Sequence, residues 1–165
     1  MFESRGMSMK QIDTHISIHE MQISNYDEIY KLWESTPGMG LSDADTYENI
    51  YKFMLRNKGL SFVCRHEDKI IGTILCGHDG RRGYIYHVTV AEKYRRRGIG
   101  QMLVDKSLQK LKEEVIIKCH LFVFSGNEIG NAFWSDKGWT KREDIFVYSK
   151  TINDDLYLKR GEGTC

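Results

Sequence analysis

Apolar residues alternate with polar ones, or recur at helical spacing, along most of the chain, and this pattern predicts its elements. Alternation predicts a first strand that begins at Ile16. Helical spacing of the apolar residues that follow predicts a helix capped by Ser24 or Asn25. A second helix is predicted to start at Ser42 or Asp43, since either side chain can cap a helix. The first third of the chain therefore predicts one strand followed by two helices.

The middle of the chain predicts three strands joined by short turns. Runs rich in β-branched and aromatic residues predict strands over 60–65, 69–77 and 84–90. Because the turns between them are short, we expect these neighbours to be antiparallel. The remaining predicted elements are a helix over 100–114, a strand over 115–124, a short helix over 127–137 and a last strand over 144–148. The predicted order is β-α-α-β-β-β-α-β-α-β.

Length, charge and cysteine placement narrow the function classes. The 165 residues suit one domain, expected over 15–152 between a leader (1–14) and a C-terminal tail (153–165). A net charge of +1 gives no overall field to attract nucleic acid or anionic lipid. No apolar run approaches the length of a membrane span, and the 4 cysteines form no C-x-x-C pair, so no metal site is indicated. We therefore expect a cytoplasmic protein with no membrane or nucleic-acid partner.

A basic loop that contains glycine, residues 95–100, joins the strand over 84–90 to the next helix. The first amides of a helix lack intrahelical partners, and that end carries a partial positive charge. Gly98 and Gly100 let a ligand approach the backbone, and the three arginines before them offer forked donors. The expected ligand is a phosphate or pyrophosphate. Neither a Walker loop nor the third glycine of a dinucleotide fingerprint is present, and a basic surface turn is the alternative.

Two motifs resemble those of the GNAT superfamily of N-acetyltransferases. Arg95-x-x-Gly98-x-Gly100, after an apolar strand end, resembles the family's acetyl-coenzyme A loop, [Q/R]-x-x-G-x-[G/A]. Asn127-x-x-Gly130-x-x-Phe133-Trp134-x-x-x-Gly138-Trp139 resembles a later family segment, although it also fits an ordinary capped helix. The element order over 16–152 is that of the GNAT fold. The resemblance implies an α+β fold with a mixed, mostly antiparallel sheet flanked by helices.

The same resemblance implies acetyl-coenzyme A as co-substrate and a set of residues that hold it. Loop amides would bind the pyrophosphate, and backbone groups at the end of the preceding strand would hold the pantetheine arm. The implied residues are Val88, Thr89, Val90, Arg95, Arg96, Arg97, Gly98, Ile99, Gly100, Gln101, Asn127 and Phe133. In the family, the strands on either side of the loop and its helix part from each other. The gap would lie here between residues 88–90 and 121–124.

The sequence leaves more than one candidate for the general acid and for the general base. Trp134 stands where the family usually has a tyrosine that protonates the leaving thiolate, and an indole N–H is no useful acid. Tyr148 is another candidate for that acid. The strand over 84–90 holds no carboxylate, so the candidates for the base are His87 and Tyr84, which is near the position of a family glutamate. A histidine satisfied in the core or at the surface is the alternative interpretation of His87.

Strict alternation along that strand predicts which candidate faces the site. It places Tyr84, Tyr86, Val88 and Val90 on one face, and Ile85, His87 and Thr89 on the other. Only one face lines a cleft, so we expect His87 and Tyr84 not to share it.

The sequence as a whole predicts transfer of an acetyl group from acetyl-coenzyme A to a primary amine by direct attack. A non-catalytic acyl-coenzyme A sensor is the alternative, and nucleic-acid binding through the basic loop is disfavoured by the net charge. The acceptor stays open among a protein N-terminus, a lysine, a polyamine, an amino acid and an antibiotic amine. Asp43 and Asp45 could attract a cationic amine or cap a helix. A homodimer is the expectation at family level.

Overall fold

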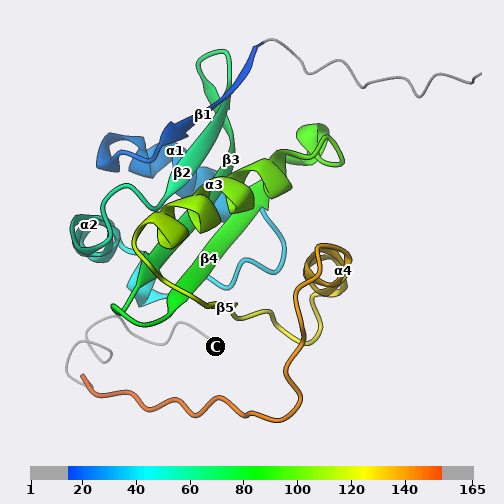
Figure 1. Cartoon of the computed structure of the whole chain (residues 1–165). Coiled ribbons are helices and arrows are strands. Elements are labelled where there is room, and N and C mark those ends of the chain that lie inside the picture. Colours follow the sequence, from blue (N-terminus) through cyan, green and yellow to red (C-terminus); the bar gives the residue numbers. More distant parts are fainter. Residues whose placement is uncertain (1–14, 154–165) are drawn as a thin grey trace, which may run out of the picture. The chain divides into compact units, whose positions relative to one another are not determined.

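A computed structural model of the chain describes residues 15–153 (Figure 1). The chain forms two compact units, one ending at Asn131 and the other beginning at Ala132, and each is described by itself. The first unit holds the sheet, three of the four helices and the start of the fourth. The predicted leader, residues 1–14, lies outside the described residues, as does most of the predicted tail.

The sheet of the first unit has five strands in the order of the sequence, β1-β2-β3-β4-β5. Neighbouring strands are antiparallel except β4 and β5, which run parallel. The strands are β1 (Ile16–Glu20), β2 (Phe62–His66), β3 (Lys69–His78), β4 (Gly83–Val90) and β5 (Cys119–Leu121). The short turns between β2, β3 and β4 produce the antiparallel pairs, as predicted, and α3 carries the chain across to the parallel pair. The predicted mixed, mostly antiparallel sheet is confirmed.

Residues 15–153 form four α-helices. They are α1 (Tyr26–Glu34), α2 (Tyr47–Arg56), α3 (Ile99–Glu113) and α4 (Glu128–Asp136). Asn25 occupies the N-cap position of α1, as predicted, although its side-chain oxygen accepts from Gln22 N rather than from the helix. The second helix starts later than predicted, because Ser42 caps a separate 3-10 turn over Asp43–Asp45. Thr46 then caps α2 by accepting from Asn49 N.

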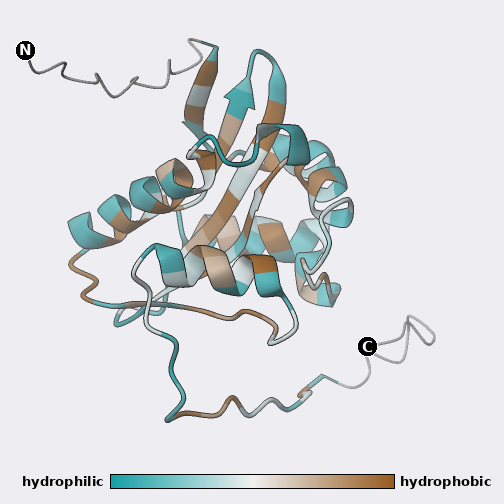
Figure 2. Ribbon diagram, turned by 90° about the vertical axis from the view of Figure 1, so that its right-hand side faces the viewer, coloured by the Kyte–Doolittle hydropathy of each residue, from teal (hydrophilic) through white to brown (hydrophobic). Residues whose placement is uncertain are grey.

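The helices cover opposite faces of the sheet, and each face has its own buried contacts. In Figure 1, α3 lies in front of the strands and α1 behind them. Leu103 of α3 and Trp33 of α1 are both fully buried. On the α2 side, a Cβ added at Gly77 would lie 2.6 Å from the Asn57 side chain, so glycine is needed where strand and helix end meet. Apolar segments recur along the strands and the helices that pack on them (Figure 2).

Two of the predicted strands differ from the structure. The strand predicted over 115–124 shortens to β5, because residues 114–116 form the C-terminal turn of α3, with Val115 at a φ of +62° and Ile116 N donating to Leu111 O. The strand predicted over 144–148 is not formed, and this prediction was wrong. A strand forms only by pairing with another strand. Residues 132–153, the described part of the second unit, contain no strand with which residues 144–148 could pair.

A β-bulge in β4 overturns the predicted assignment of faces. Thr73 pairs with Thr89, and Leu75 pairs with Tyr86. Between these two pairs β4 has one more residue than β3, which defines the bulge. His87 lies in this interval, with a φ of +49° that is left-handed backbone. Such a conformation costs a residue other than glycine about 1–2 kcal/mol. The extra residue breaks the strict alternation on which the assignment of faces depended.

The contacts on either side of the bulge show the corrected faces. The Tyr86 ring lies 6.0 Å from Phe53 of α2, and the Tyr84 ring stacks on Tyr86. Beyond the extra residue, the His87 ring lies 4.6 Å from Trp33 of α1. Tyr84 and His87 therefore lie on the same face of the sheet, the one covered by α1 and α2. The prediction that they could not share a face was wrong.

None of the helices within residues 15–153 has both the length and the apolar character that a membrane span requires.

Candidate functional site

The face of the sheet covered by α1 and α2 holds a histidine–aspartate pair. His87 Nε2 lies 2.6 Å from Asp45 Oδ1, and both side chains are largely buried, at 13% and 7% exposed. His87 comes from the bulge of β4, and Asp45 ends the 3-10 turn that precedes α2. Ser42 N and the Ser42 hydroxyl donate to the other carboxylate oxygen, at 2.8 and 3.4 Å. The turn therefore fixes the carboxylate, and the carboxylate fixes the imidazole.

The charge of Asp45 sets the proton arrangement of the pair. Burial disfavours the carboxylate, but the hydrogen bond and charge of His87, with the bonds from Ser42, outweigh it and lower the pKa of Asp45. An ionised carboxylate only accepts hydrogen bonds, so the proton between the two groups belongs to His87 Nε2. In the neutral imidazole, Nδ1 then carries the lone pair. Among the described residues Nδ1 has no hydrogen-bond partner, and it is not one of the fully enclosed unpaired atoms.

Buried hydroxyl groups hold the bulge that carries His87. Thr73 Oγ1 donates to His87 O at 3.1 Å and accepts from Trp33 Nε1 at 2.9 Å. Beyond the bulge, Thr89 Oγ1 lies 3.0 Å from Thr36 Oγ1. Because Thr36 gives its only hydroxyl proton to Leu32 O, Thr89 is the donor of this pair. The strand is thus tied to β3 and to the C-terminal end of α1.

The basic loop leads from β4 into α3, as predicted. Gly98 occupies the N-cap position with a φ of +83°, and it makes no side-chain cap. The first hydrogen bond of the helix runs from Met102 N to Gly98 O, so the amides of Ile99, Gly100 and Gln101 precede the helical ladder. No acidic residue lies in this first turn. The end of α3 therefore offers backbone donors and the positive end of the helix dipole.

Two of the three loop arginines also shape the loop itself. Arg95 Nε donates to Val90 O at 2.9 Å, and an Arg97 Nη atom donates to Lys93 O at 3.2 Å. The Arg97 guanidinium lies over the Tyr94 ring, 5.3 Å from its centroid. Arg96 has a left-handed backbone, with a φ of +61°. These contacts stabilise one backbone conformation of the exposed cationic loop that precedes α3.

One atom beside this helix end has unused hydrogen-bonding capacity. Within residues 15–153, Gln101 Oε1 is the buried side-chain oxygen or nitrogen that has no hydrogen-bond partner. The side-chain nitrogen of Gln101 donates to Asp105 Oδ1 at 2.6 Å, one turn along the helix. A Cβ at Gly98 would meet nothing within 4 Å, so the space above the cap is open. The free amides and the open space fit an anionic ligand at this position, whereas Gln101 Oε1 is an acceptor and can pair only with a hydrogen-bond donor.

β4 and β5 part where the sequence predicted a gap. Their pairing runs from Gly83 with Cys119 to Ile85 with Leu121 and ends there. Just after the end of β4, Ala91 N donates to Ile71 O of β3. Backbone groups alternate in direction along an antiparallel ladder, so the N–H of Val90 points away from β3. It points toward the edge of β4 at which the pairing with β5 has already ended. Val88 lies inside the bulge, outside the register with β3.

The remaining predicted residues are divided between the two units, and each has contacts within its own unit. Tyr84 stacks on Tyr86, with ring centroids 6.5 Å apart, and its ring lies 6.0 Å from His120 of β5. Asn127 Oδ1 accepts from Gly130 N at 2.9 Å, which is a helix-capping contact at the start of α4. Phe133 belongs to the second unit, where its ring lies 5.0 Å from Trp134. Tyr148 also lies in that unit and is 93% exposed.

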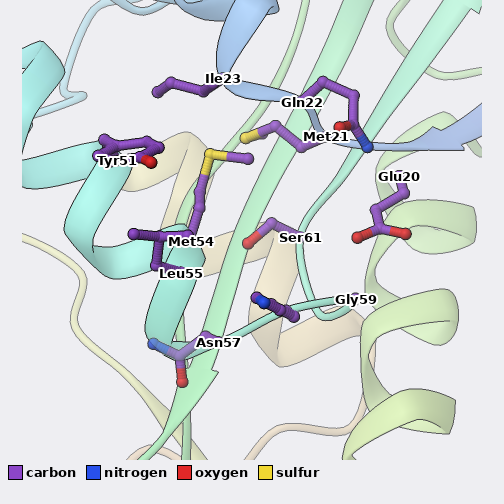
Figure 3. Close-up of a pocket in the computed structure, with 11 residues that line it drawn as sticks. Glu20, Met21, Gln22, Ile23, Tyr51, Met54, Leu55, Asn57, Gly59 and Ser61 are labelled. Carbon is purple, nitrogen blue, oxygen red and sulfur yellow. The ribbon is translucent and has the colours of Figure 1, made fainter.

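A pocket of about 230 Å³ lies between the end of β1 and the outer side of α2 (Figure 3). The Met21 and Met54 side chains point toward each other inside it, with Tyr51, Asn57 and Ser61 around them. None of the residues predicted for the site lines this pocket.

The parting of β4 from β5, the start of α3 without a side-chain cap and the basic loop are the features that the resemblance to the GNAT superfamily implied. The model of the acetyltransferase (GNAT) family matches residues 26–139. The chain belongs to this family. This GNAT acetyltransferase is thus an acetyl-coenzyme A-dependent N-acetyltransferase, as predicted.

Solved structures show the same fold for this GNAT acetyltransferase. A GNAT acetyltransferase from Staphylococcus aureus Mu50 matches with a TM-score of 0.68 and 25% identity, over 79% of this chain and 89% of that one. The PaiA N-acetyltransferase from Thermoplasma acidophilum, in complex with coenzyme A, matches with a TM-score of 0.69 and 17% identity, over 79% and 92%. An aminoglycoside acetyltransferase from an uncultured soil metagenomic sample, in complex with sisomicin, matches with a TM-score of 0.68 and 19% identity, over 86% and 99%.

Sequence reasoning missed the pairing of Asp45 with His87. Asp45 was assigned to helix capping or to attraction of a cationic amine, and its main-chain turn does carry a cap from Ser42. The two residues lie 42 positions apart, and no local pattern links them. A signal was nevertheless present, because a buried strand histidine requires a polar partner, and the acidic residues of the α1–α2 connection were the candidates.

Proposed function

We propose that this acetyltransferase transfers the acetyl group to a primary amine by direct attack, with His87 as the general base. The observation that carries the proposal is the 2.6 Å contact between His87 Nε2 and Asp45 Oδ1. This contact leaves Nδ1 as the proton acceptor and places a buried negative charge where it stabilises the imidazolium. Tyr84 lies on the same face with its ring stacked on Tyr86, and there it lines the site.

The chemistry requires one proton acceptor and no acyl-enzyme. The nitrogen of a neutral amine forms a bond to the acetyl carbonyl carbon, the carbon–sulfur bond breaks, and coenzyme A leaves as a thiolate. The attacking nitrogen must lose one proton, which passes to His87 Nδ1 directly or through a water molecule. The three cysteines that the structure describes as free thiols all have raised pKa values because they are buried, so they are poor nucleophiles at neutral pH.

The start of α3 is the proposed site for the diphosphate of acetyl-coenzyme A. The amides of Ile99, Gly100 and Gln101 would hold it, since they precede the helical ladder and the helix dipole favours an anion. The guanidinium groups of the basic loop add charge, and Gly98 leaves room for close approach. Val90 N–H points into the gap between β4 and β5, where the amides of the pantetheine arm can pair with it. The Thermoplasma acidophilum neighbour solved with coenzyme A supports this use of the fold.

The acceptor side of the site is proposed to lie toward the α1–α2 connection, from which Asp45 reaches His87. A carboxylate that stays ionised there favours an acceptor whose other groups are cationic. An aminoglycoside acetyltransferase is among the structural neighbours, so sisomicin belongs in the first acceptor panel, together with polyamines and peptides with free N-termini.

The proposal is tested by repeated release of free coenzyme A thiol from acetyl-coenzyme A in the presence of that panel. We expect many turnovers per enzyme with at least one primary amine, and loss of turnover in His87→Gln with the KM for acetyl-coenzyme A retained. Binding of acetyl-coenzyme A with no release of thiol for any amine would instead support a sensor. Full activity of His87→Gln would remove His87 from the mechanism.

A further inference from the structure

The bulge that presents His87 depends on two residues that lie behind it and touch no substrate. We infer that Thr73 and Trp33 are positioning residues, which hold the His87 backbone and ring in the arrangement that transfers the proton. This inference deepens the proposed function and depends on His87 as the base. Its support is two successive hydrogen bonds, from Trp33 to Thr73 and from Thr73 to His87, and a ring contact between Trp33 and His87, whose backbone is left-handed.

The hydrogen bonds run in one fixed direction. Trp33 Nε1 carries a hydrogen and can only donate, and it donates to Thr73 Oγ1 at 2.9 Å. The hydroxyl proton of Thr73 is thereby left for the carbonyl of His87, 3.1 Å away. Trp33 and Thr73 are both 0% exposed, so water does not compete for either bond. The indole therefore sets the direction of the hydroxyl, and the hydroxyl holds the peptide that follows His87.

The bond to the carbonyl of His87 is made inside the bulge, where the register between β3 and β4 is interrupted. His87 lies in the interval where β4 has one more residue than β3, so no β3 residue is in register with it. A backbone carbonyl buried without a partner is unfavourable, and left-handed backbone at a histidine persists only where the surroundings hold it. The Thr73 hydroxyl supplies a partner for this carbonyl at the point where the register is interrupted.

Trp33 also restricts the orientation of the His87 imidazole. Its ring lies 4.6 Å from the His87 ring, at an interplanar angle of 50°. Asp45 holds the Nε2 edge of the same imidazole. One indole thus restrains the His87 ring by contact and the His87 backbone through Thr73. If these restraints were lost, the strand could return to strict alternation, which would turn His87 away from Asp45.

The test compares two changes at Thr73 with one control change elsewhere in the full-length protein. Thr73→Val keeps the shape and removes the hydroxyl, whereas Thr73→Ser restores a hydroxyl in the same place. Ser107→Ala is the matched control, because Ser107 is also a fully buried hydroxyl that donates to a backbone carbonyl, Leu60 O, but it belongs to α3 on the opposite face. The measurements are kcat and KM with the best amine of the panel, and the nitrogen-15 NMR signals of the His87 ring.

We expect Thr73→Val to lower kcat by about 10- to 100-fold, since small displacements of a catalytic group have effects of that size. The KM for acetyl-coenzyme A should stay within about twofold, and the His87 ring signals should lose the signature of an Nε2–H bonded to a carboxylate. Thr73→Ser should recover most of kcat, and Ser107→Ala should change neither kcat nor the ring signals. Equal effects of Thr73→Val and Ser107→Ala, with the His87 signals unchanged, would overturn the inference.

A second variant covers the case in which Thr73→Val fails to fold because the Trp33 N–H is left unpaired. The double variant Thr73→Val with Trp33→Phe removes donor and acceptor together, which is far better tolerated. Loss of kcat and of the ring signature in the folded double variant supports the inference, and wild-type values for both overturn it. The parent proposal fails differently: His87→Gln would then keep its activity, whatever Thr73→Val does to the ring signals.

Discussion

Nε2 of His87 and Oδ1 of Asp45 lie 2.6 Å apart, although 42 residues separate them in the chain. The contact exists because β4 has a bulge and because the 3-10 turn before α2 places a carboxylate opposite it. In this acetyltransferase, the pair supplies an oriented imidazole on the face of the sheet where α1 and α2 pack.

Replacing the imidazole should remove proton transfer and leave binding intact. For His87→Gln, we expect kcat to fall by about 10²- to 10⁴-fold, the usual contribution of a general base. Coenzyme A affinity should not change, because the diphosphate contacts proposed here lie at the start of α3. The measurement is steady-state thiol release, with titration calorimetry for coenzyme A.

The control for this change is His78→Gln. His78 is also paired with a carboxylate, since its Nε2 lies 2.7 Å from Glu114 Oε2, but it lies at the end of β3 on the turn to β4. We expect wild-type kcat for this variant. Equal losses in the two variants would mean that histidine–carboxylate pairs act here only through stability.

Asp45→Asn should destabilise the fold at neutral pH by about 1.5–3 kcal/mol, as expected for the loss of hydrogen bonds to a buried charged group. The pKa of Asp45 is lowered in the folded state, so its stabilising contribution is present above the unfolded pKa, near 3.8. That contribution disappears as the pH falls from there through the folded pKa. Urea unfolding of wild type and variant should therefore differ at pH 7 and converge in strong acid.

The matched control is Asp68→Asn, a change of an exposed carboxylate in the β2–β3 turn. It should alter the free energy of unfolding by no more than about 0.5 kcal/mol. A difference between wild type and Asp45→Asn that grows in acid would contradict the sign derived from the lowered pKa.

Gly98→Glu should weaken coenzyme A binding by at least about tenfold, a change of about 1.4 kcal/mol. The side chain would bring a negative charge to the end of α3 and would strain a residue whose φ is +83°. Gly80→Glu is matched to it, because Gly80 also has a positive φ, of +89°, and open space at its Cβ. We expect Gly80→Glu to bind coenzyme A as the wild type does, so equal weakening in both would assign the effect to backbone strain alone.

Tyr84→Phe should retain kcat within a factor of about three. The phenyl ring can keep the stacking on Tyr86 and the contact with His120, which are the interactions of Tyr84 that the structure contains. The same thiol-release assay measures the effect. A loss of kcat comparable to that of His87→Gln would transfer the role of the base to Tyr84.

The sequence was sufficient to predict the elements that depend on local pattern. The β-branched and aromatic runs of β3 and β4, the apolar spacing of α3 and the glycine at its start all appear in the structure where they were expected. The lack of a conventional cap before α3 was also readable, because the residues before it are arginine and glycine. The parting of β4 from β5 followed from the resemblance to a family, not from composition.

What the sequence could not predict depends on single deviations from regular geometry. A positive φ at His87 leaves no mark in the sequence, yet it moved this side chain to the face that holds Tyr84. The left-handed Val115 likewise lengthened the turn after α3 and shortened β5. For Ile145 to Tyr148, the residues have high β-propensity, but a strand forms only with a partner, and propensity does not supply one.

The central claim, that His87 accepts the proton of the attacking amine, is tested most directly by the pH dependence of kcat/KM with two amines of different basicity. If the pH at which kcat/KM falls changes with the amine, that limb of the profile reports ionisation of the substrate. If this pH is the same for both amines, the limb reports ionisation of a group on the enzyme. We expect wild type to show a fixed acid limb with both amines, and His87→Gln to lack it. Profiles that contain only the movable limb, in wild type and variant alike, would contradict the claim.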